Sequence, residues 1–356
     1  MPVSVLKQLT ILLLLLVKGC SPGANVSSDW LLIYYMPYDN DLSGWTDSLL
    51  LSMEEMAGPG FSVSVHSDRS GDGGMDRYMF TDGRVEHNHV IGENSHAGST
   101  LDAYLDWVFS KVESEKVAMI FLDHGGELDE TGLDEFSENG EGFMKIQDIE
   151  ASLGRLNNRR GKLTDLLFFQ VCAKSSIEPL YQLRRSASYT LASQNLLGAP
   201  NYYYEYLKDL SPDVSAKDLA KAIVEGERSD MYYSLSLIDN AEWDPLITSM
   251  DRIAGFPSTP KGEIPLMIRY WENNYIDLRS FVKMYTTDPA LVGEFDAAFD
   301  KLLVWHRINP ADKRMDGYCG INILSPWDPH FPDFSEMEFY RRVRVKVFAD
   351  SIRSGG

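Results

Sequence analysis

The sequence predicts an α/β protein with a mostly parallel sheet, helices on both faces of that sheet, and a smaller C-terminal region of helices and strands. Two observations support this prediction. Dense apolar runs of strand length alternate with segments of helical pattern between Trp30 and Ile238. Two of the runs end directly on reactive side chains, and ligands of parallel sheets bind beyond the carboxyl ends of strands. The apolar fraction of 44% is ample for a large core.

The strands are expected where apolar or alternating runs are bounded by turn residues. The expected buried strands are Trp30–Met36, Phe61–His66, Lys116–Leu122, Leu166–Val171, Tyr189–Ala192 and Tyr232–Ile238. A short β excursion over Tyr78–Phe80 and Val85 should turn at Asp82–Gly83, a pair that favours hairpins.

Helices are expected between these strands, at Trp45–Met56, Leu101–Ser110 and Asp148–Leu156. Ser99 or Thr100 should cap the second of them, because hydroxyl side chains accept hydrogen bonds from free helix N–H groups. The acid- and glycine-rich segment Glu127–Gly142 is typical of a surface loop. The C-terminal region should contain helices Ile276–Thr287 and Pro289–Ile308, a strand Gly320–Ser325, and a basic closing helix or strand Phe339–Ile352.

Charge and cysteine content exclude two classes of protein. The formal net charge is −20, which argues against nucleic acid as a partner because phosphate binding requires clustered Lys and Arg. There are three cysteines, Cys20, Cys172 and Cys319. A disulfide scaffold would carry a denser and even set, so each of the three needs its own explanation.

The N-terminus reads as a targeting signal. Lys7 precedes an apolar run, Leu9–Val17, that is too short to span a bilayer and fits a signal peptide. Lys18-Gly19-Cys20 resembles a bacterial lipobox, which implies cleavage before Cys20 and acylation of that residue. The alternative is plain secretion. The following stretch, 21–28, lacks the acids typical of surface-exported lipoproteins, so we expect an outer-membrane lipoprotein of the cell envelope that faces the periplasm, with surface exposure left open.

Cys172 and His124 each follow a predicted buried strand. Such an arrangement could bring a thiol nucleophile and an imidazole to one edge of the sheet. The N–H groups of Gly125 and of Cys172 itself could then stabilise an oxyanion. A single cysteine at a strand end is more often structural, and that alternative stays open on pattern alone. We expect Cys319 to be such a structural thiol.

No metal or cofactor is expected. His87 and His89 would share one face of a strand, but no third ligand lies near them in the sequence. The acids Asp129, Asp134 and Glu135 do not follow a calcium-binding loop pattern. Metalloprotease, P-loop and dinucleotide-binding motifs are absent from the sequence.

As an ordered set, several segments resemble the clostripain family of cysteine peptidases, relatives of caspases, gingipains and legumains. The matching segments are Trp30–Leu42, Phe61–Arg69, Phe121–Gly126, Leu167–Glu178, Tyr189–Gln194, Ser234–Asp239 and Gly320–Pro326. The resemblance implies a caspase-like fold and a cysteine endopeptidase that acts on peptide or protein substrates without a cofactor. It implies a dyad of His124 and Cys172, with Gly125 in the oxyanion hole. We expect a monomer.

On this basis the chain divides into four parts: a signal peptide (1–19), a lipid-anchored tether (20–29), a caspase-like catalytic domain (30–245) and a C-terminal region that completes the fold (246–356). Family members can be activated by cleavage between the His and Cys segments, where Lys145, Arg159 and Arg160 lie.

Two departures from the family bear on specificity. Gln170 and Gln194 occupy positions where the family usually has acids that attract basic substrate residues. We expect Gln170, Ser193 and Gln194 to line the substrate pocket. Because the charge-assisted bonds are lost, cleavage after Arg or Lys is in doubt and the preferred residue stays open. The alternatives are a catalytically weak, peptide-binding envelope lipoprotein and, less favoured, a carbohydrate-binding or structural lipoprotein.

Overall fold

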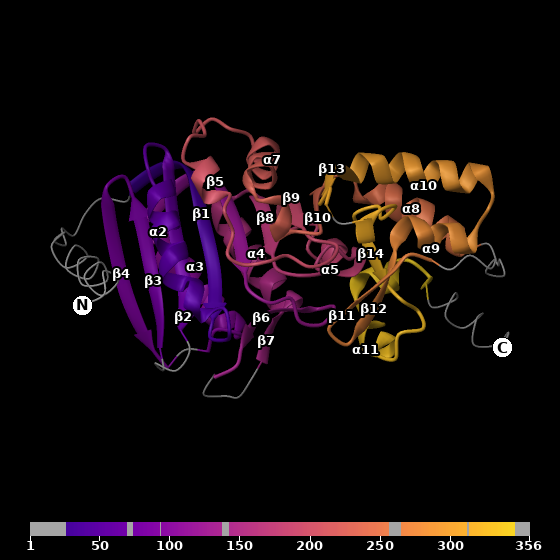
Figure 1. Ribbon diagram of the computed structural model, residues 1–356, viewed down its shortest axis with the longest axis horizontal. Coiled ribbons are helices and arrows are strands. Elements are labelled where there is room, and N and C mark those ends of the chain that lie inside the picture. The colour runs from indigo at the N-terminus through magenta and orange to yellow at the C-terminus, as the bar shows by residue number, and fades with distance from the viewer. Residues whose placement is uncertain are drawn as a thin grey trace.

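The computed structural model describes residues 26–69, 74–92, 94–136, 142–255, 265–311 and 313–345. Its centre is a nine-stranded sheet in the order β13-β10-β9-β8-β5-β1-β2-β3-β4 (Figure 1). The parallel strands at the middle are β1 (Val26–Tyr38), β2 (Phe61–Arg69), β5 (Val112–Leu122), β8 (Thr164–Gln170) and β9 (Ala187–Ala192). Antiparallel strands extend both edges: β3 (Gly74–Thr81), β4 (Arg84–Ile91), β10 (Ser234–Asp239) and β13 (Leu303–Ile308).

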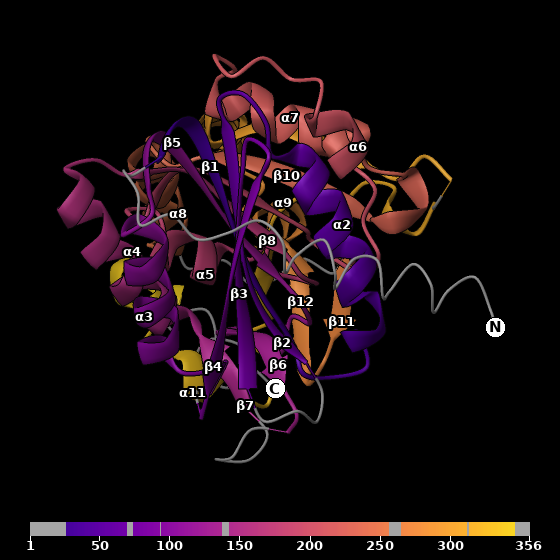
Figure 2. The same ribbon diagram turned by 90° about the vertical axis from the view of Figure 1, so that its left-hand side faces the viewer.

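Two hydrophobic layers cover the sheet, because successive side chains of a strand point to opposite faces. On β1, Leu31 and Ile33 belong to one core cluster, whereas Leu32 and Tyr34 belong to the other. Figure 2 shows helices α2, α6 and α7 on one face and α3 and α4 on the opposite face. The first face carries α2 (Thr46–Met56), α6 (Tyr204–Leu207) and α7 (Ala216–Gly226). The second core includes α3 (Gly98–Phe109), α4 (Ile146–Arg160), α5 (Ile177–Gln182), α8 (Trp243–Ala254), α9 (Leu278–Tyr285) and α10 (Pro289–Leu302).

Two small sheets lie beside the main one. The three-stranded sheet orders β11 (Met267–Tyr270), β12 (Asn273–Asp277) and β14 (Asn322–Leu324). The two-stranded sheet pairs β6 (Glu130–Asp134) with β7 (Gly142–Lys145). Short helical turns complete the described chain: η1 (Ser43–Trp45), η2 (Ser229–Met231), η3 (Lys313–Met315), α11 (Phe331–Phe334) and α12 (Glu338–Arg342). The predicted α/β class, with a mostly parallel sheet covered on both faces, is confirmed.

Several predicted boundaries were wrong. β1 begins at Val26, which pairs with Val112, so residues 26–29 belong to the sheet and not to a tether. The predicted helix Pro289–Ile308 ends at Leu302, and residues 303–308 form edge strand β13 against β10. This edge strand comes from the C-terminal region, which therefore completes the main sheet.

Three further expectations need correction. Neither Ser99 nor Thr100 caps α3, whose N-cap residue is Ala97. The expected helix from Ile276 begins only at Leu278, after β12, where the Asp277 carboxylate accepts a hydrogen bond from Ser280 N–H. The expected surface loop Glu127–Gly142 contributes β6, in which Leu133 and Asp134 are buried, so this segment is partly a structural element.

The predicted signal peptide, Cys20 and most of the predicted tether lie outside the described residues, as does the end of the closing segment from residue 346. None of the described helices has both the length and the apolar character needed to cross a bilayer.

Candidate active site

His124 and Cys172 follow two strands that are neighbours in the main sheet. β5 and β8 are adjacent and parallel, and Leu122 pairs in register with Gln170. His124 and Cys172 each follow that pair by two residues, so both emerge at the same carboxyl edge. The two residues line one pocket of about 350 Å³. The structure therefore places the two side chains that were predicted to be catalytic in one pocket.

Cys172 sits on a sharp turn. Ala173, which follows it, has a positive φ of 54°, and its N–H donates to the Asn195 carbonyl at 2.9 Å. The Cys172 thiol lies 3.4 Å from the N–H and 3.5 Å from the carbonyl oxygen of Leu197. Burial raises the thiol pKa, while the Leu197 N–H, the Tyr270 hydroxyl and the charge of Lys174 oppose that rise.

His124 is held from two sides. Its Nε2 lies 2.7 Å from the Asp41 carboxylate, which is 79% exposed. Its carbonyl accepts a hydrogen bond from Gly132 N–H of β6 at 3.0 Å. Asn40 extends this support, because its amide donates to the Asp123 carboxylate at 2.9 Å and to the Leu133 carbonyl at 2.8 Å. The loop after β1 and the strand β6 thus fix the position of the imidazole.

Gly125 joins the two reactive segments. A Cβ at this position would lie 2.3 Å from the Cys172 carbonyl oxygen and 3.1 Å from Tyr270 Cε1, so only glycine fits. The Gly125 N–H donates to the Tyr270 hydroxyl at 3.3 Å. Tyr270 ends β11 and was not predicted from the sequence. Its hydroxyl therefore lies at the junction of the expected oxyanion donor and the thiol.

Lys174 is a second residue near the thiol that was not predicted from the sequence. Its side chain is fully buried, and Nζ donates to the Glu127 carbonyl at 2.6 Å. Burial lowers its pKa to about 7, although the nearby acids and Cys172 oppose the shift. No local pattern marks this residue, because lysines in surface segments have the same appearance in a sequence.

Of the three residues expected in the substrate pocket, only Gln170 lines it. The Gln194 amide nitrogen instead donates to Asp277 at 3.1 Å, and its amide oxygen accepts from Gly320 N–H at 2.9 Å. Ser193 is buried and donates to the Asn195 carbonyl at 2.8 Å. The prediction that Gln194 and Ser193 line the pocket was therefore wrong. The Gln194 side chain joins the main sheet to the C-terminal region, and the Ser193 side chain stabilises the loop in which it lies.

The pocket walls are mostly apolar and aromatic. Besides the dyad and Gln170, they comprise Tyr38, Leu42, Leu122, Asp123, Leu196, Leu197, Gly198, Ala199, Asp230, Met231, Tyr232 and Tyr233. Both acids in this set are engaged: Asp123 by the Asn40 amide and Asp230 by an ion pair with Arg228. Within the described chain the pocket therefore presents no acid that is free of a side-chain partner.

The remaining predicted groups are placed as follows. Cys319 is buried, its N–H donates to Asp277 at 2.6 Å, and burial raises its thiol pKa well above the ordinary value. His87 and His89 share one acceptor, Asp76 Oδ1, at 2.8 and 3.0 Å. A set of carboxylates able to hold a metal ion lies elsewhere, at Asp39, Asp68 and Asp134.

The fold is of the caspase-like class, and it places a thiol and an imidazole in one pocket at the carboxyl edge of its main sheet. A family model described as "Clostripain family" matches residues 34–289, and the chain belongs to that family. No curated protein matches the chain.

Solved structures of similar fold include two of secreted C11 cysteine proteases from Bacteroides thetaiotaomicron. One, in complex with an irreversible peptide inhibitor, has 20% identity and a TM-score of 0.68, covering 91% of this chain and 99% of its own. The other, called iotapain, has 15% identity and a TM-score of 0.70, covering 90% and 99%. An inactive zymogen C11 protease from Parabacteroides distasonis has 16% identity and a TM-score of 0.63, covering 91% and 99%.

Proposed function

We propose that this cysteine peptidase is an endopeptidase in which Cys172 attacks the substrate carbonyl and His124 carries the proton. The observation that carries the proposal is the shared pocket of Cys172 and His124, with Gly125 packed against the Cys172 carbonyl.

In the proposed reaction the Cys172 thiolate adds to the substrate carbonyl carbon, and the resulting oxyanion accepts a hydrogen bond from the Gly125 N–H. Protonated His124 then gives its proton to the leaving amine, and a thioester forms at Cys172. Water, deprotonated by His124, hydrolyses that thioester and regenerates the thiol. The hydrogen bond from the Gly125 N–H to the Tyr270 hydroxyl has to break before this N–H can donate to the substrate oxygen.

The decisive experiment is cleavage of a diverse peptide library by the purified protein and by its Cys172→Ala variant. We expect internal cleavage by the first and none by the second. A thiol-directed electrophile should label Cys172 and leave the buried Cys319 unmodified. Cleavage that persists in Cys172→Ala would exclude this residue as the nucleophile.

The substrate side chain that enters the pocket is proposed to be uncharged. Gln170 stands on the pocket wall in place of an acid, and the acids Asp123 and Asp230 are already engaged. A lysine or arginine side chain would lose its hydration without gaining a charge-assisted hydrogen bond. Ranking peptides that differ only at this residue tests the point, and preferred cleavage after Lys or Arg would contradict it.

A catalytically weak, peptide-binding protein is the second candidate. Two observations favour it: the Tyr270 hydroxyl engages the expected oxyanion donor, and burial raises the pKa of the Cys172 thiol. Calorimetric binding of a peptide library without detectable cleavage would support this candidate.

We also propose that the protein is exported and held in the cell envelope by lipid at Cys20. The support is the signal-peptide pattern and the Lys18-Gly19-Cys20 step in the sequence. Metabolic incorporation of a tagged fatty acid should occur in the wild type and be lost in Cys20→Ser. Equal incorporation in both would contradict lipidation at Cys20.

A further inference from the structure

The pocket that contains Cys172 and His124 is lined by polar side chains with unused hydrogen-bonding capacity. Tyr38, Gln170 and Tyr232 all line this pocket, and their exposed fractions are only 0%, 2% and 1%. The Tyr38 hydroxyl, Gln170 Nε2 and the Tyr232 hydroxyl are buried and have no hydrogen-bond partner of good geometry among the described residues. Buried polar groups are rarely left unpaired, so these three atoms favour a ligand that supplies the missing partners.

The orientation of the Gln170 amide is set by one neighbour. Its Oε1 accepts a hydrogen bond from the Tyr203 hydroxyl at 2.6 Å, and that hydroxyl lies 3.3 Å from the hydroxyl of Tyr34. The amide oxygen is therefore occupied, and Nε2 is the end that remains to donate. Nε2 also interacts with the Tyr204 hydroxyl, but neither of these two atoms forms a hydrogen bond of good geometry. A substrate group beside Gln170 would meet a donor and should supply an acceptor.

The charges around the pocket disfavour an ionised substrate side chain of either sign. Among the described residues that line it there is no lysine or arginine, so a substrate carboxylate would lose its hydration without gaining a cation. A basic side chain would find both lining acids engaged, Asp123 by the Asn40 amide and Asp230 by Arg228. A neutral side chain avoids both costs.

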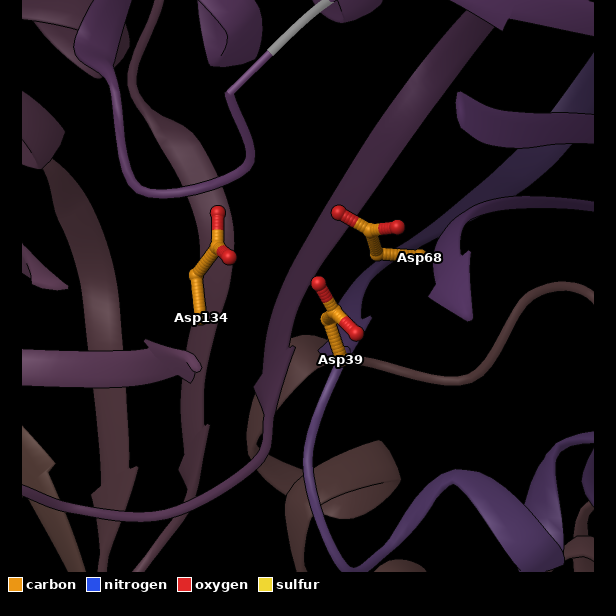
Figure 3. Close-up of side chains that lie close together, drawn as sticks. All are labelled: Asp39, Asp68 and Asp134. Carbon is orange, nitrogen blue, oxygen red and sulfur yellow. The ribbon is translucent and has the colours of Figure 1, made fainter. Parts of the chain in front are cut away.

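The acid that follows Tyr38 in the chain does not change this balance. The carboxylate of Asp39 reaches toward those of Asp68 and Asp134, as Figure 3 shows, and oxygen atoms of the three lie within 4.8 Å of one another. None of these three residues lines the pocket. Their negative charge is therefore directed to a different part of the molecule.

An apolar substrate side chain would suit the leucine and methionine side chains of the pocket but would leave the three polar atoms unpaired. Sites that are built to hydrogen-bond a substrate group reject analogues without that group far more strongly than apolar pockets reject a change in size. A neutral amide meets both requirements. Its oxygen can accept from Gln170 Nε2, and its NH2 group can donate to a tyrosine hydroxyl.

We propose that this pocket selects an uncharged amide side chain of the substrate, that of glutamine or asparagine, through Gln170, Tyr38 and Tyr232. The selection rests on the proposed function, in which the residue before the cleaved bond enters the pocket beside Cys172. It narrows the substrate class from uncharged side chains in general to those that both accept and donate hydrogen bonds.

The test uses five peptide pools that are identical except at one fixed residue, which is glutamine, asparagine, methionine, glutamate or lysine, with randomised residues on both sides. Methionine and glutamate match glutamine in length, so they separate the effect of the amide from those of size and charge. Mass spectrometry of the products identifies the cleaved bond. We expect kcat/KM of the wild type for cleavage after glutamine or asparagine to exceed that after the other three by about tenfold or more.

Two variants and a control locate the selecting groups. Gln170→Met keeps the side-chain length and removes the amide, so the ratio of cleavage after the preferred amide to cleavage after methionine should fall roughly tenfold. Tyr38→Phe removes only the hydroxyl, and the ratio should fall by about threefold. Gln147→Met makes the first change on the exposed face of α4 and should leave the ratio as it is. Because the Tyr38 hydroxyl has no partner of good geometry in the protein, its loss should not unfold the chain, and Tyr38→Phe keeps the test decisive if thermal melts show that Gln170→Met is unfolded.

Retention of the same pools on immobilised Cys172→Ala protein gives the order of binding without turnover, and the amide pools should be retained most. Amide pools that are retained but not cleaved by the wild type would contradict the proposed reaction and support amide selection. Cleavage at Cys172 that is equal for all pools, or best after methionine, glutamate or lysine, would overturn amide selection and leave the proposed reaction standing. Equal retention of all pools, or an amide preference unchanged in both Gln170→Met and Tyr38→Phe, would also overturn it.

Discussion

Replacing Gly125 by alanine tests whether the close contact between the His124 and Cys172 segments is required for activity. The added Cβ would lie 2.3 Å from the Cys172 carbonyl oxygen, whereas real Cβ contacts essentially never fall below 3.0 Å. The two segments must therefore separate by about 0.7 Å or more, the difference between these distances. A displacement of about 1 Å at a reacting centre can cost on the order of 100-fold in rate. We therefore expect kcat/KM to fall by roughly 30- to 100-fold.

The assay compares wild type, Gly125→Ala and Gly154→Ala for peptide cleavage and for the rate of Cys172 alkylation. Gly154 lies on α4, and a Cβ there meets nothing within 4 Å, so this variant controls for the loss of a glycine. Thermal melts monitor folding in parallel. If Gly125→Ala is folded and its kcat/KM stays within threefold of wild type, the close contact between the two segments is not required for activity.

Three further predictions concern the groups around the thiol. Tyr270→Phe removes the hydroxyl that lowers the Cys172 pKa, so the pH profile of Cys172 alkylation should move to higher pH. An unmoved profile would show that the hydroxyl does not act on the thiol. Lys174 is charged below about pH 7 and neutral above it. Lys174→Met should therefore slow Cys172 alkylation at pH 6 and leave its rate nearly unchanged at pH 9. An equal effect at both pH values would contradict this charge assignment. Gln170→Asp restores an acid on the pocket wall, and a charge-assisted bond of roughly 1.5–3 kcal/mol should raise relative cleavage after Lys or Arg by about 10- to 150-fold. The matched change Gln147→Asp, on the exposed face of α4, should leave the peptide ranking as it is.

The centre of the fold could be predicted from the sequence because its strands are buried on both faces and read as continuous apolar runs. The ends of the strands could not be predicted in this way, because they extend beyond the core. In β5, for example, Glu113 and Glu115 alternate with more buried neighbours, and the apolar run begins only later. Residues 303–308 were assigned to a helix because the helical pattern of α10 runs into them without a break.

The candidate site was predictable where a residue directly follows a strand and was not where its place depends on distant contacts. The shared position of Cys172 and His124 at one sheet edge could be predicted because each follows a parallel strand. Gln194 also follows a strand, but Asp277 and Gly320, far along the chain, bind its amide and keep it out of the pocket. Tyr270 reaches Gly125 and the thiol from a separate small sheet, and no local pattern signals these contacts.

The register of β5 against β8 has a consequence for how this protein could diversify. Backbone hydrogen bonds, which are the same for every side chain, set where the two reactive residues emerge. The pocket walls that would select a substrate come largely from segments further along the chain, 196–199 and 230–233. If the proposed reaction holds, reactivity and selectivity are encoded in different parts of the polypeptide, and new preferences could evolve by exchange of these segments while Cys172 and His124 keep their positions.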